Sequence, residues 1–139
     1  MTNAASSARA HRWTSRACGA PLVIVGDETS IGLVYAATHQ DPTRLVSACL
    51  TVEDVESARR VAEHLGLLDV ALVARRGDDS HFAAMEATLA EAAVDGASLV
   101  LTGNAGTIQR LRQGLRPRSF PTGRVITKAY WALGKTGLD

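Results

Sequence analysis

Short apolar runs alternate with stretches of helical periodicity along most of the chain. Each of five runs predicts a strand, at residues 22–25, 44–50, 70–74, 97–101 and 125–131. Between the runs, apolar residues recur at every third or fourth position, which predicts helices with one apolar face. These faces include Ile31 and Val34, Val55 and Ala62, Phe82 and Leu89, and Ile108 and Leu115. Continuous apolar strands are typical of a sheet covered on both sides, so the pattern indicates an α/β domain.

The order of these elements restricts the topology. Strands separated by helices of ten or more residues need crossover connections, which predicts one doubly wound, mostly parallel five-stranded sheet with helices on both faces. Thr51, followed by Asp54, predicts the start of the second helix, and Gly66 its end. Residues 1–19 lack periodicity and are expected to form a loose tail, so the domain is placed at 20–139.

Composition and charge narrow the choice of partners. The chain has 139 residues, with 15 Lys and Arg against 14 Asp and Glu. This balance gives no indication of nucleic-acid binding. Cys18 and Cys49 show no metal-ligand or disulfide spacing, so no metal is expected. Neither a membrane span nor a secretory signal is recognised, and a cytoplasmic location is expected.

Ligands of doubly wound sheets bind beyond the carboxyl ends of the strands, where the strand order reverses. The turn expected after the first strand consists of Gly26, Asp27, Glu28, Thr29 and Ser30. Gly26 permits a sharp turn, while Thr29 and Ser30 place hydroxyls and backbone N–H groups at a helix start, where a phosphate is favoured. Gly32 would allow the helix to approach the strand or a ligand closely. The alternative is an ordinary turn, because the segment is neither GxGxxG nor a Walker loop.

A second candidate turn follows the fourth strand. It contains Gly103, Asn104, Ala105 and Gly106 between two threonines. Such small residues allow a ribose or a flat ring to approach the backbone, although they also suit a simple tight turn. Because both turns open on one edge of the sheet, we expect them to contribute to one site.

Two further groups are candidates for cofactor binding. Arg75 and Arg76 follow the third strand and could hold a 2′-phosphate, or could simply be solvated. Tyr130 and Trp131, near the end of the fifth strand, could stack on a planar ring or pack as core. The sequence shows no nucleophile–base pair, so no catalytic residue is assigned.

Three segments together resemble a known family. They are Val25 to Ser30 (VGDETS), Thr102 to Gly106 (TGNAG), and Lys128 to Trp131 (KAYW) with the terminal GKTGLD. These segments resemble the C-terminal NAD(P)H-binding domain of the ferredoxin-NADP reductase superfamily. The nearest branch is the siderophore-interacting proteins, which are FAD-containing ferric-siderophore reductases. The resemblance covers about residues 21–139.

The resemblance implies roles for the candidate residues. The turn at 26–30 would hold the dinucleotide pyrophosphate, and residues 103–106 would lie by the nicotinamide ribose. Arg75 and Arg76 would read a 2′-phosphate, while Tyr130 and Trp131 would lie toward the flavin. The expected cofactor is NADPH or NADH, with FAD present only if a separate flavin domain is available.

Members of this family carry an N-terminal barrel that binds FAD, for which this chain has no room. We therefore expect the nucleotide-binding portion of an NAD(P)H:flavin oxidoreductase, inactive alone, whose flavin comes from another domain or chain. One alternative is a non-catalytic domain that binds itself, as a homodimer, or a partner. Another is a methyltransferase-like domain, which needs an acidic residue near Glu53, although a helix start explains that segment better.

Overall fold

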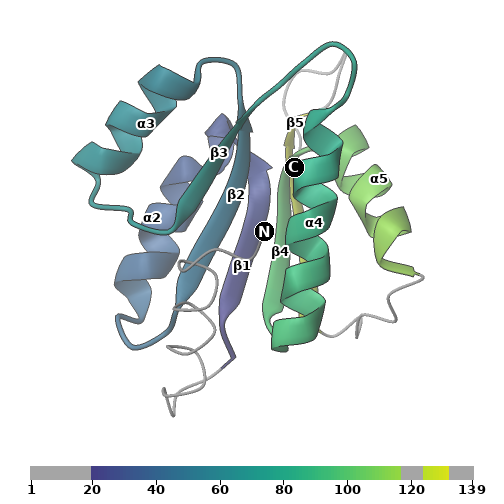
Figure 1. Cartoon of the computed structure of the whole chain (residues 1–139). Coiled ribbons are helices and arrows are strands. Elements are labelled where there is room, and N and C mark those ends of the chain that lie inside the picture. The colour runs from purple at the N-terminus through teal and green to yellow at the C-terminus, as the bar shows by residue number, and fades with distance from the viewer. Residues whose placement is uncertain (1–19, 117–123, 132–139) are drawn as a thin grey trace.

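The computed structural model describes residues 20–116 and 124–131, and these form five parallel strands with helices on both faces (Figure 1). The strand order is β3-β2-β1-β4-β5, so the predicted fold class is confirmed. The strands are β1 (Leu22–Asp27), β2 (Val46–Val52), β3 (Val70–Ala74), β4 (Ser98–Asn104) and β5 (Val125–Trp131). The helices are the short η1 (Glu28–Ser30), then α2 (Ile31–Gln40), α3 (Val55–His64), α4 (His81–Asp95) and α5 (Ala105–Leu115).

The sheet separates two hydrophobic cores. Helices α2 and α3 cover one face, and α4 and α5 cover the other (Figure 1). Successive side chains of a strand point to opposite faces, so one apolar run supplies both cores. In β1, for example, Ile24 packs in the α2–α3 core while Val25 packs in the α4–α5 core, and both are fully buried. This explains why the central strands read as continuous apolar runs.

Three strands extend further toward their carboxyl ends than the sequence predicts. β1 includes Gly26 and Asp27, β2 ends at Val52, and β4 continues through Gly103 and Asn104. The added residues pair with neighbouring strands, and at Gly26, Asp27, Gly103 and Asn104 this pairing overrides a weak strand propensity. The two predicted turns are therefore largely strand ends, from which the next helices begin almost directly.

The start of α3 also differs from the prediction. Asp54 is its N-cap, and its carboxylate accepts a hydrogen bond from the Ser57 amide at 3.2 Å. Thr51 is instead a buried residue of β2. The predicted helix start at Thr51 was wrong because the pairing of β2 with β3 continues past that residue, to Val52 and Ala74. The predicted end is confirmed: Gly66 adopts a left-handed φ of 72° just beyond the helix.

Candidate functional site

The strand order reverses between β1 and β4, which lie side by side at the centre of the sheet. The helices that follow them, α2 and α5, run on opposite faces (Figure 1). The two predicted turns meet at this point: a Cβ built on Gly103 would lie 2.7 Å from Oδ2 of Asp27. The structure thus brings the two turns together at the position where doubly wound sheets bind ligands.

The polar groups of the first turn largely bind one another. Asp27 is buried, and its Oδ1 accepts hydrogen bonds from the Thr29 amide at 3.0 Å and from the Thr29 hydroxyl. Its own amide donates to the Ser30 hydroxyl at 3.4 Å. These contacts form a reciprocal cap on η1. A phosphate would therefore meet a turn in which the Thr29 amide is already bound by the Asp27 carboxylate.

The glycines of this segment have different environments. A Cβ on Gly26 would lie 2.5 Å from the Ser30 hydroxyl and 2.7 Å from Cγ2 of Thr102, so the chain itself fills the space beside Gly26. Gly32 has no atom within 4 Å of a Cβ position, so the expected close approach of its helix to the strand was wrong. The Thr102 hydroxyl is buried and has no hydrogen-bond partner among the described residues.

The second turn provides an open helix start. Asn104 is the N-cap of α5, and its side-chain oxygen accepts a hydrogen bond from the Thr107 amide at 2.9 Å. Gly103 has a φ of 102°, next to an irregularity in the pairing of β4 with β5. Ala105 is half-buried and Gly106 exposed, so small residues border the surface here.

Arg75 connects the carboxyl ends of three strands. Its Nη1 donates to Oε1 of Glu28 at 2.6 Å and to the Thr51 carbonyl at 3.0 Å. Its Nη2 donates to Oε2 of Glu28 at 3.1 Å and to Oε2 of Glu53 at 3.2 Å. The Glu53 amide donates to the same Glu28 oxygen at 2.8 Å. The sequence analysis did not recognise this network, whose members lie far apart in the chain; Arg76, by contrast, has an exposed side chain.

The network has a consequence for stability at low pH. Burial by itself raises the pKa of the Glu28 carboxyl, but hydrogen bonds from Arg75 and the Glu53 amide, with the Arg75 charge, hold that pKa below its ordinary value. A lowered folded-state pKa stabilises the fold above the unfolded-state pKa, and this stabilisation is lost as the pH falls through the folded-state value. We expect Arg75→Met to lower the free energy of unfolding by about 1 kcal/mol at pH 7.

Urea unfolding of both proteins between pH 7 and pH 3 measures this difference. The difference in unfolding free energy between wild type and Arg75→Met should decrease toward zero as the pH approaches 3. Arg59→Met, which breaks an exposed pair with Glu56, is the control and should cost less than about 0.5 kcal/mol. If this difference in unfolding free energy stays constant over the whole pH range, ionisation of Glu28 does not contribute to the stability that Arg75 provides.

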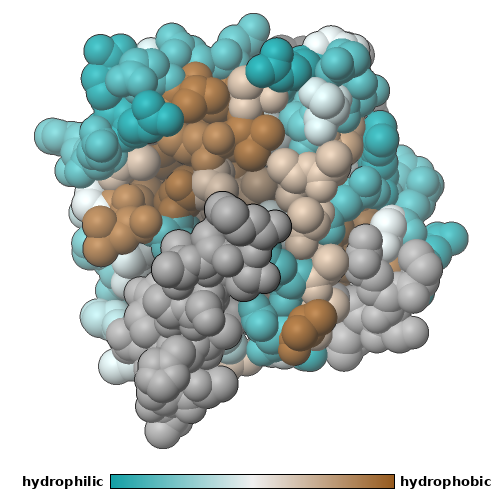
Figure 2. Space-filling view, in the orientation of Figure 1, coloured by the Kyte–Doolittle hydropathy of each residue, from teal (hydrophilic) through white to brown (hydrophobic). Residues whose placement is uncertain are grey.

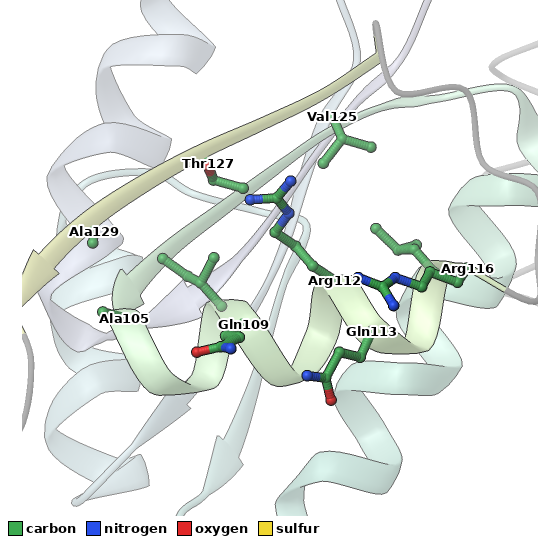
Figure 3. A pocket seen from close by; sticks show the side chains of 10 residues that line it. Ala105, Gln109, Arg112, Gln113, Arg116, Val125, Thr127 and Ala129 are labelled. Atoms are coloured by element: carbon green, nitrogen blue, oxygen red, sulfur yellow. The ribbon is translucent and has the colours of Figure 1, made fainter.

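A groove of about 820 Å³ lies between α5 and the edge strand β5 (Figure 3). Val125, Thr127 and Ala129 of β5 form one wall, and Arg112 and Arg116 of α5 line the other. Ala105, a residue of the second turn, also lines the groove. This groove could not be recognised from the sequence. The residues that line it lie on α5 and β5, which also supply core residues, so their apolar pattern indicates only burial.

The aromatic candidates are only partly described. The backbones of Tyr130 and Trp131 form the end of β5, where Trp131 pairs with Asn104. This places them next to the second turn. Their side chains lie outside the described part of the chain.

Other kinds of site find no support in the described ranges. Within 20–116 and 124–131, no group of three His, Cys, Asp or Glu side chains is arranged to hold a metal ion. Cys49 is buried, and burial raises the pKa of its thiol, which disfavours a reactive thiolate. No helix in these ranges is both long and apolar enough to cross a bilayer.

Comparisons with known proteins agree with this geometry. The chain is similar to a ferredoxin reductase in carbazole 1,9a-dioxygenase, in its FAD apo form, with a TM-score of 0.59, 12% identity and coverage of 81% of this chain and 36% of that one. It is also similar to flavohemoglobin from Malassezia yamatoensis, with a TM-score of 0.50, 13% identity and coverage of 81% and 32%. These likenesses show a ferredoxin reductase-like fold, and the chain spans about a third of each structure.

The family comparison covers most of the sequence. No curated protein matches the chain. The sequence pattern of one family matches residues 20–134, a range that includes both turns and the whole described sheet. The chain belongs to the siderophore-interacting protein family.

Proposed function

We propose that this chain is the NAD(P)H-binding portion of an FAD-dependent oxidoreductase whose flavin is held by another domain or chain. The observation that carries the proposal is the meeting of the two turns at the reversal of strand order, where Gly103 packs on Asp27 and two helices begin. That position is the usual dinucleotide site of such sheets. Because the chain spans about a third of the matched structures, the flavin site is assigned to a segment beyond it.

The proposed site divides along the carboxyl edge of the sheet. The start of α2, with residues 26–30, faces the pyrophosphate, and the start of α5, with residues 103–106, faces the nicotinamide ribose. Tyr130 and Trp131 lie toward the flavin. When bound, the nicotinamide would supply a hydride for a flavin held elsewhere, and the reduced flavin would supply electrons for a ferric siderophore. The chain contributes by orienting the nicotinamide beside β4 and β5.

A second candidate function is assembly with a partner or another copy. The edge strand β3 is apolar at all five positions, none of them fully buried, and the nearby Leu68 is 98% exposed. Figure 2 shows apolar side chains gathered at this edge, between α3 and α4. An exposed apolar edge strand is suited to pairing with another chain.

Calorimetric titration with NADH tests the proposed function. Wild type should bind NADH, and Gly32→Glu should weaken binding at least about tenfold, because it places a carboxylate at the start of α2, where the pyrophosphate would lie. Gly32 has open space around it, and an acidic residue suits the first turn of a helix, so this variant should fold normally.

Gln40→Glu is the matched control, since it adds the same charge at the other end of α2. Its dissociation constant for NADH should stay within about twofold of wild type. Circular dichroism should show all three proteins folded. A folded wild type that gives no heat with millimolar NADH or NADPH would contradict the proposal, as would equal losses in both variants.

A further inference from the structure

Charge is distributed unevenly along the chain. Residues 1–95 contain eight Lys or Arg and thirteen Asp or Glu, whereas residues 96–138 contain seven Lys or Arg and no Asp or Glu. The seven are Arg110, Arg112, Arg116, Arg118, Arg124, Lys128 and Lys135. In the fold, this later segment supplies β4, α5 and the edge strand β5. The net charge of +1 for the whole chain therefore conceals a cationic side, and such an asymmetry points to an anionic partner.

Two of these cations line the groove between α5 and β5 (Figure 3). Arg112 and Arg116 are exposed, and neither side chain forms an ion pair or a hydrogen bond with a described residue. They lie one helical turn apart, and like charges at this spacing repel one another. None of the described residues that line the groove is an Asp or Glu. A carboxylate between α5 and β5 would relieve this repulsion, so the groove is electrostatically complementary to an acidic occupant.

The edge strand adds a second feature to this surface. Within the described ranges no strand pairs with the outer side of β5, and such an edge can accept another strand. Val125, Thr127 and Ala129 line the groove, so the alternation of a strand points Ile126 to the opposite face of the sheet. Ile126 is apolar and yet 61% exposed. A strand added beside β5 would place every second side chain near the groove arginines and the others near Ile126.

The groove suits a protein segment better than a nucleic acid or a membrane. Proteins that bind single-stranded nucleic acids stack the bases on aromatic side chains, and none of the described residues that line the groove is aromatic. A helix that lies in a membrane surface exposes its apolar face, whereas Ile108, Leu111 and Leu115 of α5 are buried in the α4–α5 core. The neighbouring segments of this chain, 117–123 and 132–138, contain no Asp or Glu and so supply no side-chain carboxylate.

We infer that α5 and β5 form a docking site for an extended acidic segment of a partner protein, which adds to the sheet beside β5. Acidic side chains on one face of this segment pair with Arg112 and Arg116, and apolar side chains on its other face cover Ile126. Main-chain hydrogen bonds to β5 supply affinity, and the alternation of side chains supplies selectivity. The inference goes beyond the proposed dinucleotide site and does not depend on it.

Fluorescence anisotropy at low salt, with a labelled synthetic peptide, tests this site. The peptide alternates glutamate and valine and has the seven-residue length of β5. It should bind wild type, and the double variant Arg112→Gln/Arg116→Gln should weaken binding at least about tenfold. Ile126→Ser should weaken it several-fold, because the apolar contact is lost. A peptide with glutamine in place of glutamate should bind wild type at least about tenfold more weakly. High salt should weaken binding of the acidic peptide.

Arg110→Gln is the matched control. It removes the same charge from α5, but Arg110 lies over the Phe82 ring and does not line the groove. The affinity of this variant for the peptide should stay within about twofold of wild type. Circular dichroism should show every variant folded, since the substituted side chains are exposed. Equal losses in Arg110→Gln and in the double variant would overturn the assignment to the groove.

A second peptide tests the addition of a strand. Successive amides of a strand point to opposite edges, so two successive prolines at the centre of the peptide remove one amide that faces β5. This peptide should lose most of its affinity, whereas a peptide with two alanines at the same positions should keep more of it. Equal binding of the two peptides would overturn strand addition.

Other outcomes would overturn the inference as a whole. One is a folded wild type that shows no saturable binding of the acidic peptide, and another is undiminished binding by the double variant. Oligothymidine that binds more tightly than the peptide, and is lost in the double variant, would assign the surface to nucleic acid. A dimer in sedimentation that the double variant disperses would assign it to a second copy. Tighter peptide binding by Asp139→Asn would assign the groove to the chain's own last residue, the single acidic residue after Asp95.

Discussion

Gly103→Ala should destabilise the domain by about 2–5 kcal/mol, the largest effect expected from adding a single methyl group at the site. Two causes add together. Gly103 has a φ of 102°, which a residue with a Cβ adopts only under strain. The new Cβ would also lie 2.7–3.0 Å from the three atoms of the Asp27 carboxyl group. Urea unfolding followed by circular dichroism measures the change.

A double-mutant cycle separates these two causes. Asp27→Ala removes the carboxylate that the new methyl group meets, so Gly103→Ala should cost clearly less in that background, and what remains reports the backbone strain. Because Asp27 also caps η1, the single Asp27→Ala variant should itself lose about 1 kcal/mol. Strictly additive effects would mean that the contact between Gly103 and Asp27 does not form.

Gly26→Ala should cost about 1–3 kcal/mol of unfolding free energy, whereas Gly32→Ala should be neutral or stabilising. A Cβ at Gly26 would meet the Ser30 hydroxyl at 2.5 Å, Cγ2 of Thr102 at 2.7 Å and the Thr102 carbonyl at 3.0 Å. The same group at Gly32 meets nothing within 4 Å and improves helix propensity. The two variants therefore form a matched pair six residues apart.

Denaturant midpoints of these two variants, with NADH affinities measured on the folded fraction, complete the comparison. Loss of NADH binding by Gly26→Ala without loss of stability would show that the ligand, rather than the chain, needs the space beside Gly26. Equal stabilities of the two variants would contradict the packing of Ser30 and Thr102 around Gly26.

The fold could be predicted largely because periodicity reports burial. Ile24 and Val25 lie next to each other in a continuous run, and the structure places them in the two opposite cores, as a doubly covered sheet requires. Strand ends were less predictable, since Gly103 and Asn104 have weak strand propensity and remain in β4 only through pairing with β5. Propensity describes single residues, whereas pairing depends on a partner distant in sequence.

The meeting of the two candidate turns could be predicted, but the contacts within them could not. Both turns lie at the reversal of strand order, as expected from the alternation of strands and helices. The bonds of Arg75 could not be foreseen, because Glu28 is separated from it by 47 positions and no local pattern pairs them. The same holds for Asp27: its burial depends on Gly103 in another strand.

The central position of β1 has a consequence for synthesis on the ribosome. One edge of β1 pairs with β2, which follows soon after it in the chain. The other edge pairs with β4, so Leu22 cannot form its strand pair with Ser98 until Ser98 has been synthesised. At ~5–20 residues per second, the nascent chain needs several seconds to supply that partner. During this interval the apolar strand β1 lacks its partner on the side where β4 later brings the second turn next to the first.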